Sequence, residues 1–122
     1  MSETTVLYDW HVGRDARMVA FAGYLLPVQY EGVLAEHKQC RTAAALFDTS
    51  HMGQLLFRGP DAAGQLDRLL TQGASRLDVG RGRYGFLLEP DGGVIDDAIV
   101  MRLDEEEFLL VVNAGTAAED RE

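Results

Sequence analysis

Hydrophobic and polar residues alternate along the second half of the chain in the pattern typical of β-strands. The alternation predicts strands at residues 51–58, 84–88, 94–103 and 108–112. The sequence Pro-Asp-Gly-Gly at 90–93 predicts a hairpin between the second and third of these strands, because Pro pre-sets φ and Gly supplies a positive φ. An acidic turn at 104–107 is expected to join the third strand to the fourth.

One helix is predicted between the first two of these strands. Asp61 is expected to cap it, and its buried stripe is expected to be Leu66, Leu69 and Leu70. The polar, Gly-rich residues that follow, 71–83, predict a loop.

The first half of the chain has weaker periodicity and predicts shorter elements. The expected elements are a helix at 7–11, extended segments at 17–21 and 25–30, and a longer helix at 32–45. Thr4 or Thr5 can cap the first helix, and Pro27 limits the second extended segment to an edge or a bend.

The order of the elements predicts an α+β fold, an antiparallel sheet with helices packed on one side. We expect two parts: a helix and strand segment at 1–50, and a strand-helix-three-strand-helix unit at 51–122. The last helix would begin near Asn113 or Thr116 and reaches barely two turns when the sequence stops. The chain therefore reads as the N-terminal fragment of a larger, multi-domain fold.

Composition and charge narrow the classes of function. The 122 residues are 47% hydrophobic and 25% charged, which is typical of one globular domain, and the net charge is −9. This charge disfavours nucleic acid and anionic membranes as partners, which require clustered cations. The N-terminus does not resemble a secretory signal and there is no long apolar run, so the predicted localisation is cytoplasmic.

Three patterns that resemble chemical motifs lack the context that the chemistry needs. Residues 80–85 match G-x-G-x-x-G, but no helix is predicted after them to bind a pyrophosphate. Ser50 and His51 are adjacent, and neighbours on an extended chain point to opposite faces, so we expect turn and backbone contacts there and no hydrolase dyad. The single cysteine excludes an internal disulfide, and the three histidines have no metal-ligand spacing, so no metal site is expected.

Two carboxylates interrupt the apolar run of the strand at 94–103. On a strand Asp96 and Asp97 must face opposite ways, so one of them points toward whatever covers the apolar face that Ile95, Ile99 and Met101 share. Desolvation of that carboxylate must be offset, either by protonation or by a hydrogen-bond donor. A ligand rich in N–H groups would meet this need for one of them, and backbone amides of the hairpin would meet it for the other.

Five segments follow one another in a distinctive order and spacing: LYDWH at 7–11, ARMVAFAGYLLPVQY at 16–30, RTAAALFDTSHMG at 41–53, GGVIDDAIVM at 92–101 and LLVVNAG at 109–115. Through these segments the chain resembles the N-terminal part of the aminomethyltransferase family, the T-proteins of the glycine cleavage system, which belong to a wider folate-binding family. Ala20, Ala45 and Met101 stand where the family usually has Asp, Gly and an aromatic residue.

The resemblance implies a tetrahydrofolate-dependent transfer of a methylene group from an aminomethyl-lipoyl carrier, the H-protein, with release of ammonia. By motif position it implies that Asp97 contacts the pterin-side amine of tetrahydrofolate and is the catalytic residue. It implies that Met52, Tyr84, Val111 and Asn113 line the same folate site. No metal is implied.

Two other functions are compatible with the sequence. One is a folate-binding or scaffold module without catalysis, and the other is a related folate-dependent demethylase or oxidase domain. For the aminomethyltransferase, the 122-residue chain alone is expected to be inactive. Apolar surface that truncation exposes is expected to favour self-association.

Overall fold

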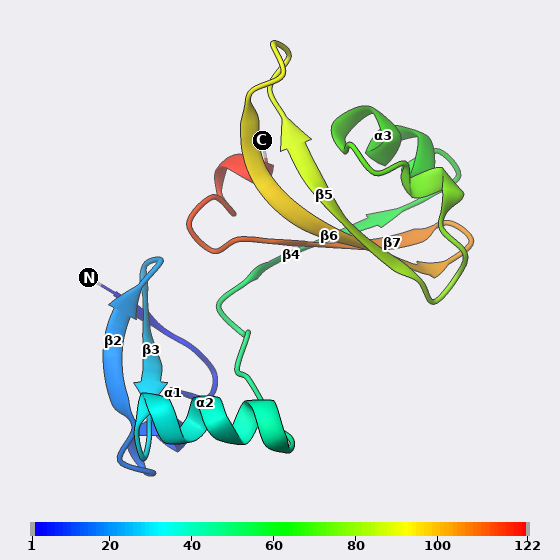
Figure 1. Ribbon diagram of the computed structural model, residues 1–122. Coiled ribbons are helices and arrows are strands. Elements are labelled where there is room, and N and C mark those ends of the chain that lie inside the picture. Colours follow the sequence, from blue (N-terminus) through cyan, green and yellow to red (C-terminus); the bar gives the residue numbers. More distant parts are fainter. Residues whose placement is uncertain (1, 122) are drawn as a thin grey trace. The chain divides into compact units, whose positions relative to one another are not determined.

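A four-stranded antiparallel sheet organises residues 52–122, the second of the two units into which the chain divides (Figure 1). Its strands are β4 (Gly53–Arg58), β5 (Gly82–Leu88), β6 (Val94–Asp104) and β7 (Glu107–Val112). The spatial order is β4-β7-β6-β5, so the meander β5-β6-β7 brings the chain back beside β4. The computed structural model describes residues 2–121.

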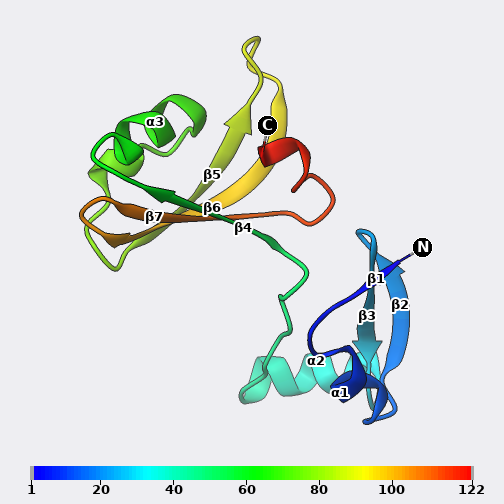
Figure 2. The same ribbon diagram turned by 180° about the vertical axis from the view of Figure 1, so that it is seen from behind.

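One face of this sheet carries the hydrophobic core. Helix α3 (Ala62–Leu69) contacts β7 and packs on that face (Figure 1, Figure 2). The alternate residues that point toward it are buried, as period-two strands predict. The core consists of Ala62, Leu66, Leu70, Ala74, Leu77, Leu87, Ala98, Val100, Phe108, Leu110 and Val112. The predicted class, α+β with helices on one side of an antiparallel sheet, is confirmed.

The hairpin between β5 and β6 is confirmed. Gly92 has φ of +93°, and the backbone N–H of Glu89 donates to the carbonyl of Gly93 at 2.7 Å. The Asp91 carboxylate accepts the N–H of Gly93, which closes the turn locally. This turn fixes the register in which Phe86 lies opposite Asp97.

The prediction of which α3 residues are buried is wrong for one residue. Leu66 is fully buried, but Leu69 is 50% exposed. The helix ends at Leu69, and Leu70 adopts an extended conformation and pairs with Leu87 of β5. Asp61 occupies the N-cap position, yet its side chain accepts no capping hydrogen bond from the described backbone.

Two glycines allow side chains to approach the sheet closely. A Cβ at Gly53 would lie 2.6 Å from Val112 and 2.8 Å from Ala117, so only glycine lets the segment after β7 pack there. A Cβ at Gly85 would collide with the buried side chain of Gln72. The chain after β7 continues to a 3₁₀ turn at Glu119–Arg121, and a second 3₁₀ turn, Ala74–Arg76, interrupts the predicted loop.

Residues 1–51 form the first unit, whose sheet has the order β1-β3-β2. Its elements are β1 (Glu3–Thr4), α1 (Tyr8–Val12), β2 (Arg17–Phe21), β3 (Tyr24–Gln29) and α2 (Val33–Thr42). β1 is parallel to β3 and reaches only Tyr24 and Leu25. Pro27 therefore lies where β3 pairs with β2 alone, which is locally an edge, as expected.

The ends of both helices in this unit differ from the prediction. Leu7 occupies the N-cap position of α1, and the Thr5 hydroxyl donates to Asp48 at 3.4 Å instead of capping the helix. Helix α2 ends at Thr42, three residues earlier than expected. Glu36, in the first turn of α2, reaches back to the segment before the helix, where its Oε1 accepts the backbone N–H groups of residues 30–32.

Candidate functional site: a carboxylate on an exposed apolar sheet face

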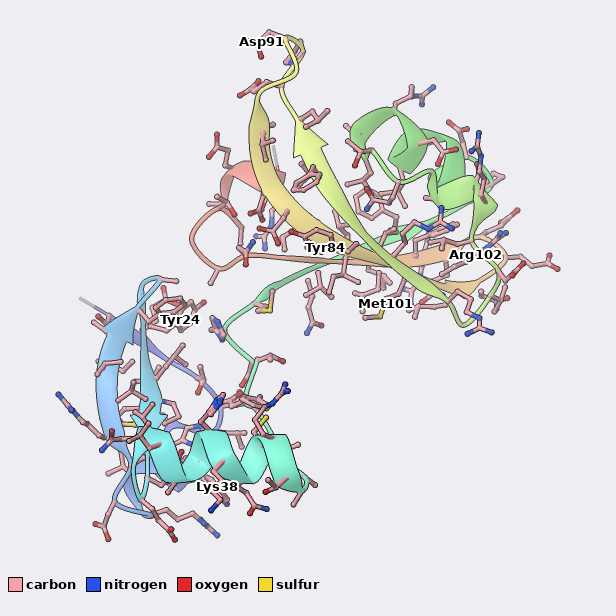
Figure 3. All side chains as sticks on the ribbon, in the orientation of Figure 1. Tyr24, Lys38, Tyr84, Asp91, Met101 and Arg102 are labelled. Atoms are coloured by element: carbon pink, nitrogen blue, oxygen red, sulfur yellow. The ribbon has the colours of Figure 1, made fainter. Side chains whose placement is uncertain are left out.

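The face of the β4–β7 sheet opposite its core is apolar and largely exposed. We define the open face as the side chains of Leu56, Tyr84, Phe86, Ile99, Met101, Leu109 and Val111, all exposed or half-buried. They are contributed by all four strands, and the register places Tyr84 opposite Ile99 and Ile99 opposite Val111. Figure 3 labels Tyr84 and Met101 on this face.

Asp97 is the carboxylate on the open face. It shares the face with Ile99 and Met101 because alternate residues of β6 point the same way, and its cross-strand neighbour is Phe86. Its side chain is half-buried. The donor that offsets its desolvation is the Asn113 amide, whose Nδ2 lies 3.0 Å from Asp97 Oδ1.

Asp96 points to the opposite face and is 6% exposed. The Asn113 backbone N–H donates to its Oδ2 at 2.9 Å, and the Asn113 side-chain amide donates to its Oδ1 at 2.8 Å. Burial alone would raise the pKa of Asp96, but these hydrogen bonds outweigh it and lower the pKa below the ordinary value. Asp96 is therefore a charged carboxylate whose main donors come from Asn113, with smaller contributions from the Thr116 side chain and the Asp97 N–H. The Asp120 carboxyl group also lies beside it.

Aromatic side chains flank Asp97 on β5. The rings of Tyr84 and Phe86 are 5.6 Å apart in an edge-to-face arrangement. Partial desolvation, and then the negative charge of Asp97, raise the pKa of the Tyr84 phenol, so the hydroxyl remains protonated near neutral pH. The sequence interpretation missed Phe86, although its two-residue spacing from Tyr84 already assigns it to the same face.

The other predicted site residues divide into two groups. Val111 lies on the open face, and Asn113 follows the last residue of β7 and contacts both aspartates. Met52 is half-buried and directly precedes β4, and no hydrogen bond or ring contact links it to the other predicted residues. Ile95, expected beside Ile99, packs against the core because β6 has a register shift near its start.

The open face is a surface and not an enclosed cavity. Shallow hollows in this unit lie along β4 near Asp120 and at the β6–β7 turn, and Asp97 lines neither of them. A flat apolar face with one carboxylate suits a flat ligand that has an N–H edge. Within residues 2–121, no three His, Cys, Asp or Glu side chains are placed to hold a metal ion.

A second polar cluster lies in the first unit. His11 is 3% exposed; its Nε2 is 2.7 Å from Asp48 Oδ2, and its Nδ1 is 2.6 Å from the Tyr30 hydroxyl. Burial would raise the pKa of Asp48, but hydrogen bonds from Ser50 and His11 lower it to about 2. The expectation that backbone groups satisfy His51 is wrong, since its buried Nδ1 has no hydrogen-bond partner among the described residues.

The chain belongs to the GCVT N-terminal domain family. The model of this family matches residues 7–122. It is 47% identical over 116 residues to the aminomethyltransferase of Chlorobium limicola and 47% identical over 116 residues to that of Moorella thermoacetica. Each match covers 95% of this chain and 32% of the relative, so the chain spans about a third of the length of these relatives.

A solved structure has the same fold. The glycine cleavage system aminomethyltransferase T from Bartonella henselae superposes with a TM-score of 0.94 at 42% identity. The superposition covers 98% of this chain and 34% of that one. Among the described helices, none is long and apolar enough to cross a membrane.

Proposed function

We propose that this chain is the N-terminal part of a tetrahydrofolate-dependent aminomethyltransferase of the glycine cleavage system. The observation that supports the proposal is the half-buried Asp97 carboxylate on an apolar face, with one oxygen bonded to Asn113. Family membership and the 47% identity to curated aminomethyltransferases support the same reaction class.

In the proposed reaction, the open face receives the pterin of tetrahydrofolate. The ring would lie on Tyr84, Ile99 and Val111, and an N–H of the pterin-side amine would donate to Asp97. Reduced pterins carry several N–H groups, and Asp97 supplies an acceptor for one of them. Met52 and Asn113 complete the proposed contact set.

The proposed chemistry is a group transfer without redox change. N5 of tetrahydrofolate attacks the methylene carbon of the aminomethyl group that is bound to a lipoyl sulfur of the H-protein. The nitrogen leaves as ammonia, N10 closes the second C–N bond, and the lipoyl arm is released as a dithiol. The two hydrogens lost from N5 and N10 are recovered in the ammonia and the thiol. Asp97, as the catalytic residue, binds and orients the folate amine for the attack.

We expect the 122-residue chain to bind without completing this reaction. It spans about a third of the relatives' length, and its open face is exposed to solvent. Water there would compete for the Asp97 carboxylate and weaken every polar contact to the ligand.

Anaerobic calorimetric titration of tetrahydrofolate into the parent chain and Asp97→Asn tests the proposal. The expected result is binding by the parent that weakens at least tenfold, about 1.4 kcal/mol, in the variant. Asp78→Asn is the matched control, since Asp78 is exposed and distant in sequence from both aspartates. Equal affinity of the parent and Asp97→Asn for tetrahydrofolate would show that Asp97 does not contribute to the binding site.

A second assay separates transfer from binding. A chain extended to the relatives' length is supplied with aminomethyl-loaded H-protein and tetrahydrofolate, and methylenetetrahydrofolate is measured. Product formation that Asp97→Asn reduces supports the transferase. Folate binding without product would instead favour a binding or scaffold module.

A further inference from the structure

Asp96 is buried on the core side of the sheet, and its role is not explained by ligand contact. We propose that Asp96 is a positioning residue: through the Asn113 amide it fixes the orientation of the Asp97 carboxylate on the open face. This inference rests on the proposed function, in which Asp97 meets the ligand.

Asp96 holds Asn113 at two points. Its Oδ2 accepts the Asn113 backbone N–H, and its Oδ1 accepts the Asn113 side-chain amide at 2.8 Å. With a side chain 6% exposed, neither oxygen has much water available as an alternative partner. The side-chain torsion of Asn113 is therefore coupled to Asp96, since rotation would deprive the buried Oδ1 of the Asn113 amide as its donor.

The same amide holds Asp97. Asn113 Nδ2 lies 3.0 Å from Asp97 Oδ1 and 3.2 Å from the Asp97 carbonyl oxygen. An amide nitrogen has two hydrogens, so one is directed to Asp96 and the other is shared between the two Asp97 oxygens. Asn113 bonds only one of the two carboxylate oxygens of Asp97, and the Tyr84 hydroxyl is another protein group that interacts with this carboxylate. A ligand N–H would therefore share Asp97 with Tyr84.

The charge of Asp96 selects which way the Asn113 amide faces. A carboxylate only accepts, so the amide nitrogen and not the amide oxygen must face it. An asparagine at position 96 would remove this preference, because its own amide can donate to the Asn113 oxygen. In the flipped arrangement the Asn113 oxygen would approach the Asp97 carboxylate and repel it.

The two neighbours on β6 thereby cooperate although they point to opposite faces. Asn113 follows the last residue of β7, and from that position its amide contacts both side chains. The buried aspartate supplies rigidity and the open-face aspartate supplies the ligand contact. This arrangement matches the general requirement that a binding group be held by a supporting shell.

The test compares Asp96→Asn with the double variant Asp96→Asn/Asn113→Asp. In the double variant, the donor and acceptor exchange places, so the hydrogen bonds between positions 96 and 113 are restored. Position 113 then no longer has a donor for Asp97. Because Asn113 is itself a proposed ligand contact, the double variant reports through its stability whether the bond between positions 96 and 113 is restored. The positioning role is tested by the affinity and the NMR signals of Asp96→Asn, in which Asn113 is intact.

Two readouts are measured on both variants, with Asp78→Asn as the control. The first is tetrahydrofolate affinity, expected to fall at least tenfold in Asp96→Asn and to stay low in the double variant. The second is NMR without ligand: in Asp96→Asn the Asn113 side-chain amide protons should exchange faster and the Asp97 carboxyl carbon should change chemical shift.

The NMR readout distinguishes failure of this inference from failure of the proposed function. If the parent binds no tetrahydrofolate, the proposed function fails for this chain, and the NMR result decides the positioning role alone. Unchanged Asn113 exchange and an unchanged Asp97 shift in Asp96→Asn would overturn the inference. Unchanged tetrahydrofolate affinity in Asp96→Asn would also overturn it.

Discussion

The two units of the chain are stabilised by different kinds of interaction. In residues 52–122, side chains from α3, β5, β6 and β7 form one continuous apolar core. In residues 2–51, Leu26 is the one buried hydrophobic side chain among the described residues, and the other buried groups are Thr5 and His11. The first unit is therefore held largely by hydrogen bonds, and the second by hydrophobic burial.

This difference has consequences for the surface. Apolar side chains of the first unit are exposed, with Leu34 at 85%, Phe47 at 70% and Leu46 at 99%. All ten residues of α2 are at least partly exposed, including Cys40. A unit of this kind depends on a few specific polar contacts, so single polar substitutions should affect it more than apolar ones.

The largest expected effect is on the core of the second unit. Phe108→Ala should destabilise that unit by about 3–5 kcal/mol, because Phe108 is fully buried and its loss leaves a cavity. Amide hydrogen exchange of β5–β7 measures the change in the second unit, and fluorescence of Trp10 reports the first unit. Phe47→Ala is the matched control and should cost less than about 0.5 kcal/mol. Comparable losses would mean that both units rely on apolar burial.

The next effect concerns the polar cluster of the first unit. Asp48→Asn should destabilise this unit by about 3 kcal/mol, because it removes the charged partner of the buried His11. Trp10 is the only tryptophan, and its ring centroid is 5.4 Å from that of His11, so its fluorescence reports this unit. An unchanged Trp10 transition would show that hydrogen bonding is not what holds the first unit.

The two units should respond to pH in opposite directions. The pKa of Asp48 is lowered to about 2, so the stability it contributes is present above about pH 4 and is lost as the pH falls through about 2. Burial, and then the charge of Asp96, raise the pKa of Asp120 to about 6. Stability from Asp120 is therefore present below pH 3.8 and is lost as the pH rises through about 6.

Unfolding at pH 7, 5 and 2.5, followed by Trp10 fluorescence and by amide exchange in β4 and β7, tests this prediction. From pH 7 to 5 the second unit should become more stable, and Asp120→Asn should abolish that gain. Below pH 4 the first unit should lose stability. A gain in both units, or in neither, between pH 7 and 5 would contradict the assignment to Asp120.

The smallest expected effect on stability is at the open face. Ile99→Ser should change the stability of the second unit by less than about 1 kcal/mol, because Ile99 is already 37% exposed. The same variant tests whether the expected self-association uses this face, in which case sedimentation velocity profiles should shift toward monomer. Val79→Ser, at a site 52% exposed, is the control and should leave both unchanged. Unaltered self-association in Ile99→Ser would show that the contact uses a surface other than the open face.

Much of the secondary structure follows from the sequence because its signals are local. The alternation in β5, β6 and β7 and the Pro-Asp-Gly-Gly turn are properties of neighbouring residues, and they predicted the hairpin. Leu69 was predicted to be buried because its spacing from Leu66 is helical. Pairing of Leu70 with Leu87 ended the helix first, which is a tertiary contact that spacing does not encode.

The family, the alternation of the strands and the rule that Asp96 and Asp97 face opposite sides all follow from the order of the residues. Which of the two aspartates is buried depends on the tertiary structure, because the register of β6 between β5 and β7 assigns the faces. The tertiary structure alone brought Asn113 to both carboxylates and His11 to Asp48, pairs separated by 16, 17 and 37 residues. Hydrogen bonds between distant residues leave no periodic pattern, since they depend on how the chain returns upon itself.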